Sequence, residues 1–418
     1  MDHHLELLIL AILACVIAYS LASKAIGRTV LTLPIVFTAI GFVGAEPTVA
    51  LAAPDTLRSV ARIIAEVTLV LVLFADASHV RLSRLRASAR YPARMLLLGL
   101  PMTIALGTLA VWIVSPASLL GVAGGGLAMA LLTAALLTPT DAALGQAVVS
   151  SPDVPPRLSE TINVESGFND GLVLPFVLFG AILASTGLGA GDAQSLALGT
   201  LAQIVLGPLV GIALGWATAK LLDLAWDRDW TGEEAGALVF LATAFAAFLA
   251  AELVGGNGFI AAFVAGATFG NAFRHDIHFI EEFMEGQGRI LTMLAFLIFG
   301  ALLLPAGLDH MSWAALMVAV LFLTVVRMGP IWLSLAGTDL KLGDKLFLGW
   351  FGPRGIASIL FTLIVLDEYE LPGEEELLAC VSMTVALSIL LHGLSANPLA
   401  SRMGRGRNEA AGATVSKL

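Results

Sequence analysis

The stretch Glu165–Gly171 (ESGFNDG) places two carboxylates, an amide and a hydroxyl close together. The apolar run Leu172–Leu183 (LVLPFVLFGAIL) follows it directly. A charged side chain inside hydrocarbon costs several kcal/mol, so such residues are rare and face a bundle interior or a water-filled path. We therefore expect a membrane helix whose polar groups serve a function, and a permeating cation is the simplest candidate.

The composition of the whole chain is that of a membrane protein. Of its 418 residues, 58% are hydrophobic and 13% are charged, and the mean hydropathy is +0.91. A soluble domain has about 25% charged residues. Apolar segments of about 20 residues, the length that crosses a bilayer, follow one another along the chain. Blocks of this length exclude a β-barrel, whose strands are short and alternating, so we predict an all-α polytopic membrane protein.

Thirteen segments are candidate membrane spans. They lie near residues 5–22, 30–47, 58–79, 93–114, 122–150, 157–184, 194–222, 235–254, 257–273, 279–304, 312–336, 343–367 and 375–398. The first follows acids and histidines rather than a basic region, so we expect a span and not a cleaved signal peptide.

The basic residues predict which side each connection faces. With the N-terminus outside, 17 of the 22 lysines and arginines fall in inner connections or near the C-terminus, and only Arg58 and Arg62 fall outside. This asymmetry is what the positive-inside rule requires, whereas twelve or fourteen spans would place a basic loop on the wrong side. We predict a multi-pass protein of the cell (inner) membrane, with a short cytoplasmic tail at residues 401–418.

Two of the spans are interrupted. The fifth contains TPTD at residues 138–141, and the twelfth contains GPRG at residues 352–355. Proline removes a backbone donor and clashes with the preceding turn, and Asp and Thr are favoured where a new helix begins. Seven spans separate the two breaks, so they run in opposite directions, as in inverted-repeat transporters that bind their substrate at the bilayer midplane. Two unrelated kinks are the alternative, because Pro and Gly are common in membrane helices.

The polar residues of the sixth span share one side of the helix. Residues four apart lie on the same face, so Ser166 lies with Asp170, and Glu165 lies with Asn169 one step round. With the first interrupted span they form a set of hard oxygen ligands suited to an alkali cation: Asp170, Asp141, Thr140, Ser166 and Asn169.

Glu165 needs a partner, because a buried carboxylate either takes up a proton or pairs with a cation. Arg327 in the eleventh span is the obvious partner, since arginine stays charged and can hold a carboxylate with two hydrogen bonds. We expect this pair, together with Arg354 beside the second break, to be structural. The alternative for Arg327 is a side chain that reaches for lipid headgroups.

Asp170 is then free to bind either a proton or a cation, but not both. Outward-facing and inward-facing states would each load one of the two, and the empty charged site would not cross the membrane. This hypothesis makes Na⁺ and H⁺ the transported ions. No thiolate or imidazole group is arranged for a resident metal, no phosphate loop is present, and neither a cofactor nor a nucleic acid is expected.

At these residues the chain resembles the NhaP-type branch of the monovalent cation:proton antiporters, which includes the animal sodium/proton exchangers. The pair Thr140-Asp141 is similar to the Thr-Asp of the family's first unwound helix, and residues 165–171 are similar to the signature around its ion site. Arg327 resembles its ion-pair arginine, and residues 352–355 resemble the Arg-Gly element of its second unwound helix.

The resemblance implies thirteen spans in two inverted six-helix repeats with crossed discontinuous helices, as in the NhaA-like fold. It also implies a homodimer whose core domain moves like an elevator. We expect a single membrane unit over residues 1–400, with a core domain at 93–184 and 312–398, a dimerisation domain at 1–79 and 235–304, and a linking helix at 194–222. Many relatives carry a large cytoplasmic tail, which is not expected here.

The resemblance further implies electroneutral exchange of one cation per proton, because Asn169-Asp170 stands where other branches have two aspartates. Family members often carry an acid in a Leu-Phe-Glu motif on the third span, but here Leu73-Phe74 is followed by Ala75-Asp76. Asp76 is therefore a possible ligand or ion-path residue. Glu66 on the same span either lines the ion path or lies at the membrane interface.

Other readings of the sequence remain open. The cation could be K⁺ or Li⁺ instead of Na⁺, since oxygen ligands suit all three. An intramembrane aspartyl hydrolase could use Asp141 and Asp170 as a carboxylate pair, but Arg327 and the paired breaks would have no role in it. A passive cation channel would need a continuous pore. An organic-anion symporter fits poorly with so acidic a site. We therefore expect a transporter and not an enzyme.

Overall fold

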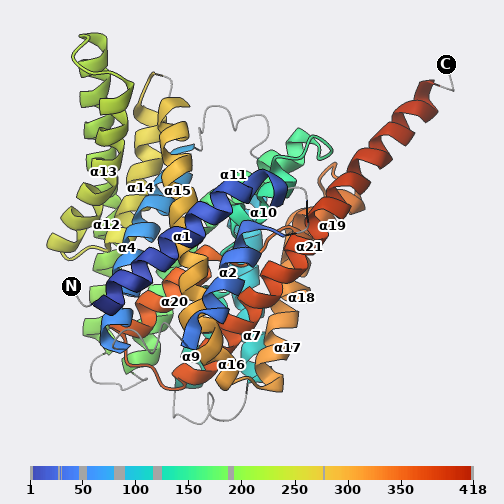
Figure 1. Ribbon diagram of the computed structural model, residues 1–418, viewed down its shortest axis with the longest axis horizontal. Helices are drawn as coiled ribbons and strands as arrows, with labels where there is room; N and C mark the ends of the chain where they lie inside the picture. Colours follow the sequence, from blue (N-terminus) through green and yellow to red (C-terminus); the bar gives the residue numbers. More distant parts are fainter. Residues whose placement is uncertain are drawn as a thin grey trace.

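The computed structural model describes residues 3–26, 29, 31–46, 54–79, 90–115, 125–186, 193–275 and 278–415. The regular secondary structure of these residues is entirely helical, which confirms the predicted all-α class. Figure 1 shows the helices packed into one bundle, with the C-terminal end of the chain projecting from it.

The helices follow one another along the chain with short connections. In chain order they are α1 His3–Ile26, α2 Leu33–Val43, α4 Pro54–His79, α6 Arg90–Arg94, α7 Leu100–Val114, α9 Gly125–Leu136, α10 Ala142–Val149, α11 Pro156–Thr186, α12 Ala193–Asp227, α13 Glu233–Leu253, α14 Gly258–Ala272, α15 His278–Ile298, α16 Leu304–Asp309, α17 Trp313–Leu323, α18 Val325–Ser334, α19 Leu342–Trp350, α20 Ile356–Glu368 and α21 Glu374–Val415. Short π-helical segments, Met95–Gly99 and Phe299–Leu303, join α6 to α7 and α15 to α16.

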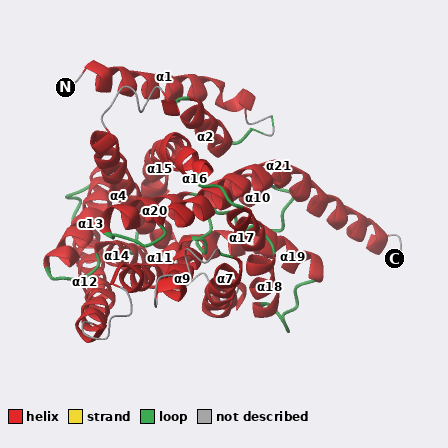
Figure 2. Ribbon diagram, turned by 90° about the horizontal axis from the view of Figure 1, so that it is seen from below, coloured by secondary structure: helices red, strands yellow, loops and turns green. Residues whose placement is uncertain are grey.

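Each of the thirteen predicted spans falls on one helix or on consecutive helices in series. Among the described residues, eight helical stretches are long and apolar enough to cross a membrane, and α2, α9 and α14 are shorter apolar helices. The end of the chain differs from the prediction. We expected the last span to stop near residue 398, but α21 continues as one helix to Val415, and this extension is the projection seen in Figure 2.

Small residues allow α14 to pack tightly between α12 and α4. A Cβ atom on Gly211 or Gly215 of α12 would lie 2.6 or 2.4 Å from a backbone oxygen of α14, and one on Gly207 would lie 2.8 Å from the backbone oxygen of Asn257, the residue before α14. A Cβ atom on Gly266 or Gly270 of α14 would lie 2.1 or 2.0 Å from a backbone oxygen of α4. Membrane helices associate closely through such stripes of small residues, so α4, α12 and α14 form one tightly packed layer.

The turn between α13 and α14 depends on a glycine in the left-handed region. Gly255 has a φ of 78°, and the amide of Gly256 donates to the carbonyl of Ala251 at 2.8 Å. Such a turn closes the end of a helix and satisfies carbonyls that have no partner within it. Asn257 then starts α14, because its side-chain oxygen accepts from the amide of Ile260 at 3.0 Å.

Two elements that run through the bundle are broken, at the places that the sequence predicts. Residues 137–141 separate α9 from α10, and residues 351–355 separate α19 from α20. Pro139 and Pro353 lie inside these breaks, where the absence of an amide donor costs nothing. The breaks expose backbone groups within the bundle, and buried backbone groups need partners.

Candidate functional site

The backbone groups freed by the two breaks bind to each other. The amide of Asp141 donates to the carbonyl of Pro353 at 2.8 Å. The Nη1 atom of Arg354 donates to the carbonyls of Thr138 and Pro139, at 2.8 and 3.2 Å. Arg354 is fully buried, so its charge lies against the two carbonyls that α9 cannot use. The two interrupted elements therefore cross at their breaks.

The carboxylate of Asp141 caps the second half of the other interrupted element. Its Oδ2 accepts from the amide of Ile356 at 2.8 Å, in the first turn of α20. A negative charge at the start of a helix is favoured by the unpaired amides and by the helix dipole. Only glycine at position 355 permits this approach, because a Cβ atom there would lie 2.0 Å from Asp141 Oδ2.

Thr140 joins the first break to the polar face of α11. Its amide donates to Asn169 Oδ1 at 3.2 Å, and its hydroxyl oxygen lies 3.1 Å from Ser166 Oγ and 3.2 Å from Glu165 Oε2. The Nδ2 atom of Asn169 donates to the same hydroxyl oxygen. All four side chains are buried. The predicted ligands Thr140, Ser166 and Asn169 thus meet in one hydrogen-bonded cluster.

Glu165 and Arg327 form a buried ion pair with two hydrogen bonds. Arg327 Nη1 and Nη2 donate to Glu165 Oε1 and Oε2, at 2.7 and 2.9 Å. Their side chains are 2% and 5% exposed, so Arg327 does not reach toward headgroups. Gly352 leaves room for the guanidinium, since a Cβ atom there would lie 2.3 Å from Arg327 Nε. The pair fixes α11 against α18 and against the second break.

Asp170 lies one helical turn from Ser166 and has a different environment from Glu165. The residue is buried, and its Oδ1 atom has no hydrogen-bond partner among the described residues. It interacts electrostatically with the nearby carboxylates of Asp76, Asp141 and Glu165. An unpaired polar atom in such a place is costly, so Asp170 differs from Glu165, whose two oxygens are both bound by Arg327.

Asp76 approaches the same region from the end of α4. A Cβ atom on Gly167 of α11 would lie 3.4 Å from the carbonyl oxygen of Asp76, so the two helices touch here. Asp76 also interacts electrostatically with Asp141. The structure therefore places Asp76 beside the predicted ligands, although its acid is displaced by one residue from the Leu-Phe-Glu pattern.

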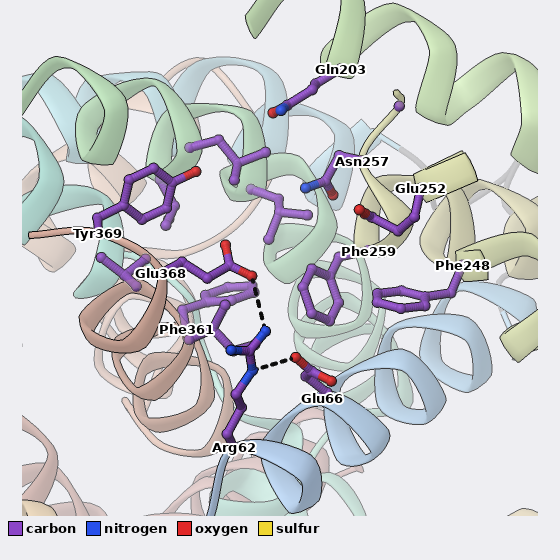
Figure 3. A pocket seen from close by; sticks show the side chains of 16 residues that line it. Arg62, Glu66, Gln203, Phe248, Glu252, Asn257, Phe259, Phe361, Glu368 and Tyr369 are labelled. Atoms are coloured by element: carbon purple, nitrogen blue, oxygen red, sulfur yellow. Dashed lines mark hydrogen bonds and ion pairs between the residues drawn. The ribbon is translucent and has the colours of Figure 1, made fainter. Parts of the chain in front are cut away.

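Glu66 lies elsewhere, in a cavity between α4, α13, α14, α11 and α20. The cavity has a volume of about 300 Å³ and also includes Arg62, Glu252 and Glu368. Figure 3 shows Arg62 pointing toward Glu66 and Glu368. Arg62 also pairs with Asp367 of α20. Leu174, one turn beyond Asp170 on α11, lines the cavity as well, so the cavity reaches toward the site.

The sodium/hydrogen exchanger family model (transmembrane domain) matches residues 9–402 of the chain. The chain belongs to the sodium/hydrogen exchanger family. This confirms the resemblance that the sequence motifs predicted. The members compared are transporters rather than enzymes, so the hydrolase alternative has no support from them.

Relatives of this exchanger carry names with different cations. The K(+)/H(+) antiporter NhaP2 of Shewanella sp. (strain MR-4) is 26% identical over 344 residues, which cover 81% of this chain and 57% of that protein. The Na(+)/H(+) antiporter NhaG of Bacillus atrophaeus is 27% identical over 290 residues, which cover 67% and 54%. The chain therefore spans 57% and 54% of the length of these two relatives.

A solved structure has the same fold as this exchanger. The sodium proton antiporter MjNhaP1 from Methanocaldococcus jannaschii at pH 8 superposes with a TM-score of 0.74 at 18% sequence identity. The match covers 96% of this chain and 99% of that one. This confirms the predicted fold class, including the pair of crossed, interrupted helices.

Three buried polar residues near the breaks of the exchanger were not predicted. Ser358 lies on α20, and Ser388 and His392 lie on α21; each is 0% or 1% exposed. The only signal in the sequence is a histidine within an apolar span. The capping role of Asp141 was missed as well, because its partner amide is 215 residues away in the chain.

Proposed function

We propose that this chain exchanges one monovalent cation for one proton across the membrane, and that the two compete for Asp170. The observation that supports this most directly is the buried Oδ1 atom of Asp170, which has no partner among the described residues. Either a proton or a cation offsets the cost of such a carboxylate. Because one occupant excludes the other, each crossing of the loaded site carries only one of them.

The remaining ligands come from the residues around Asp170. Asp141 supplies a carboxylate, and Thr140, Ser166 and Asn169 supply hydroxyl and amide oxygens from the buried cluster. Oxygen ligands of this kind suit alkali cations. We propose Na⁺ as the transported ion, with K⁺ and Li⁺ as alternatives, because the named relatives include both a K(+)/H(+) and an Na(+)/H(+) antiporter.

The proposed stoichiometry follows from the number of free carboxylates on α11. Arg327 neutralises Glu165 through two hydrogen bonds, and Asn169 carries no charge. Asp170 is then the one buried acid of this helix that can change its occupant, since Glu160, its other acid, is exposed. Exchange of one cation for one proton moves no net charge, so transport is proposed to be electroneutral.

Alternating access is proposed to occur by an elevator-like movement. The proposed core (93–184 and 312–398) carries both breaks and Asp170, and it would move against a dimerisation domain at 1–79 and 235–304, joined by the linking helix at 194–222. Arg62 of α4 pairs with Asp367 of α20 across the boundary between these two parts. Asp76 and Glu66 lie along the same boundary and are proposed to line the ion path.

The proposed setting is a homodimer in the cell (inner) membrane, with the N-terminus outside and the C-terminus in the cytoplasm. The distribution of lysine and arginine supports this orientation. Under this assignment the cavity beside Arg62 opens to the outside. Cross-linking of the protein in membranes, and labelling of cysteines placed at either end of the chain, test the two parts of this arrangement.

Transport in proteoliposomes tests the proposed function. Purified protein in vesicles with an imposed pH gradient should dissipate that gradient when Na⁺ is added, and parallel additions of K⁺ and Li⁺ rank the cations. An imposed membrane voltage should not change the rate, since no net charge crosses. Asp170→Asn should abolish the exchange.

Asp153→Asn is the matched control, because it removes an exposed carboxylate from the loop before α11 and should exchange at the wild-type rate. Exchange that survives in Asp170→Asn would overturn competition at this residue. A wild-type rate that follows the imposed voltage would overturn the one-to-one stoichiometry.

A further inference from the structure

A buried histidine on α21 touches the end of α19 just before the second break. His392 is 1% exposed, and its Nε2 atom lies 2.9 Å from the carbonyl oxygen of Trp350. Trp350 is the last residue of α19, where helix carbonyls lose their partners within the helix. This carbonyl also accepts from the amide of Gly352 at 2.8 Å, so His392 adds the contact that ties it to α21.

The other side of the same ring reaches the backbone within the break through a serine. His392 Nδ1 lies 3.1 Å from Ser388 Oγ, and Ser388 Oγ accepts from the amide of Arg354 at 2.6 Å. Nδ1 also lies 3.0 Å from the carbonyl oxygen of Ser388, so a neutral imidazole donates to one of two carbonyls. With the hydrogen on Nε2, which then donates to Trp350, Nδ1 accepts from the serine hydroxyl, and one chain of three hydrogen bonds runs from Arg354 to Trp350.

A second contact holds α19 against α21 at this place. The indole Nε1 of Trp350 donates to Ser395 Oγ at 3.0 Å, and the rings of Trp350 and His392 lie 5.0 Å apart between centroids. Because both the carbonyl and the side chain of Trp350 are bound to α21, the peptide entering the break is fixed on both sides. The chain of hydrogen bonds therefore holds the backbone of residues 350–354 against α21.

The position of these residues determines the position of the proposed ligands. Arg354 donates to the carbonyls of Thr138 and Pro139, and Pro353 accepts from the amide of Asp141. A displacement of residues 350–354 would thus be transmitted to the first break, next to Thr140 and Asp141. Through these contacts His392 is linked to the proposed cation ligands, although it is not one of them.

We infer that His392, acting through Ser388 and Trp350, is a positioning residue that sets the geometry of the cation ligands. This role rests on the proposed exchange of a cation for a proton. It predicts that loss of the imidazole weakens cation binding and leaves the carboxylate that carries the proton intact. Apparent affinity should therefore change more than the maximal rate.

Na⁺/H⁺ exchange by His392→Ala in proteoliposomes tests the inference. We expect the KM for Na⁺ to rise about tenfold, since a buried carbonyl and a serine each lose one of their partners and their tie to the imidazole, while the maximal rate stays within about twofold. His392→Gln should restore the KM to within about threefold of wild type, because its amide can donate to the carbonyl of Trp350. Ser388→Ala, which removes fewer atoms, should raise the KM in the same direction.

Ser382→Ala is the matched control on the same helix. It removes a buried hydroxyl that donates to the carbonyl of Leu303 at 2.9 Å, away from both breaks, and should leave the KM unchanged. An equal rise in Ser382→Ala would overturn the inference, because the effect would then be a general loosening of α21. If His392→Ala fails to insert into the membrane, Ser388→Ala and His392→Gln test the inference in its place. A wild-type KM in Ser388→Ala, or a KM raised tenfold or more in His392→Gln, would also overturn the inference.

The two proposals fail in different ways. A wild-type protein that exchanges no cation for protons would overturn the proposed function. A wild-type protein that does so, with unchanged KM values in His392→Ala and Ser388→Ala, would overturn only the role of His392.

Discussion

Two carboxylates of α11, five positions apart, have opposite surroundings. Glu165 is held by both terminal nitrogens of Arg327, whereas Asp170 Oδ1 has no partner among the described residues. The helix itself is the same for both, so the difference comes from α18, which presents an arginine to one of them only. Charge compensation by a neighbouring helix therefore distinguishes the paired acid Glu165 from Asp170, the acid that we propose exchanges its occupant.

Breaking this ion pair should destabilise the protein strongly. Glu165→Gln leaves the guanidinium of Arg327 buried without a counter-charge, a change that costs about 3–5 kcal/mol. We expect a clearly lower Tm in detergent, and a smaller loss in the double variant Glu165→Gln/Arg327→Met than in either single one. Glu66→Gln is the control: it breaks a pair whose side chains are 43% and 30% exposed, worth about 0–1 kcal/mol. An equal Tm for Glu165→Gln and Glu66→Gln would contradict the argument.

Gly355 should tolerate no side chain, because the capping carboxylate of Asp141 occupies the space. In Gly355→Ala the new Cβ would lie 2.0 Å from Asp141 Oδ2. The displaced carboxylate should lower the exchange rate by at least about tenfold, measured in proteoliposomes and normalised to inserted protein. Gly343→Ala in α19, where a Cβ atom meets nothing within 4 Å, should exchange normally. A Gly355→Ala variant as active as Gly343→Ala would disprove this reading of the contact.

The residues of the site could be predicted where helical spacing or the need to pair a buried charge constrained them. Helical spacing placed Ser166 with Asp170, and the shortage of buried charges made Arg327 the natural partner of Glu165. Helical spacing carries no information on contacts between distant segments. The bond from Ile356 to Asp141 and the contact of His392 with Trp350 arise only when the two breaks and α21 come together.

At the scale of elements, the connection between α18 and α19 is tied to two helices of the first half of the chain. Asp339 in this connection accepts from the hydroxyl of Tyr91 in α6 at 2.6 Å and from Arg157 in α11 at 3.1 Å. These contacts hold the start of the second interrupted element beside the helix that carries Asp170. A single exposed aspartate thereby ties the connection between α18 and α19 to two helices, α6 and α11.

Acid should remove the contribution of Asp339 to stability. The hydrogen bond from Tyr91 and the charge of Arg157 hold the pKa of the Asp339 carboxyl below its usual value. The contribution is therefore fully present above the unfolded pKa of about 3.9 and is lost as the pH falls through the folded value. We expect the Tm difference between wild type and Asp339→Asn to be positive and constant from pH 7 to about 4 and to shrink as the pH falls further. Tyr91→Phe should shrink it at neutral pH, and a difference that does not decrease on acidification below about pH 4 would contradict this assignment.

The elements themselves were largely predictable. Proline and glycine mark both interruptions, at TPTD and GPRG, and each of the thirteen predicted spans falls on one helix or on consecutive helices. The end of α21 was not predictable, because residues 403–415 are too polar for a span and contain three glycines, yet the helix continues to Val415. The length of an apolar segment indicates whether it can cross the membrane, whereas the residue at which a helix ends depends on local backbone chemistry.

For the whole molecule, the ion pairs of Arg62 join two parts that must move apart or slide if the exchanger works as an elevator. Arg62 lies on α4, in the proposed dimerisation domain, and its partners Asp367 and Glu368 lie at the end of α20, in the proposed core. Figure 3 shows the guanidinium between the two helices at the edge of the cavity. Salt bridges between exposed side chains are weak, so this contact can break and re-form during transport.

A covalent bond at the same place should stop transport. With Cys15 and Cys380 replaced by alanine, the pair Arg62→Cys/Asp367→Cys should exchange cations before treatment, lose exchange when joined by a short disulfide-containing cross-linker, and regain it on reduction. The matched pair Arg157→Cys/Asp339→Cys also replaces an ion pair, but both positions lie within the proposed core, so its cross-link should leave exchange intact. Exchange that continues in the cross-linked Arg62→Cys/Asp367→Cys protein would mean that α4 and α20 do not move relative to one another, because a fixed distance between them would then be compatible with the full transport cycle.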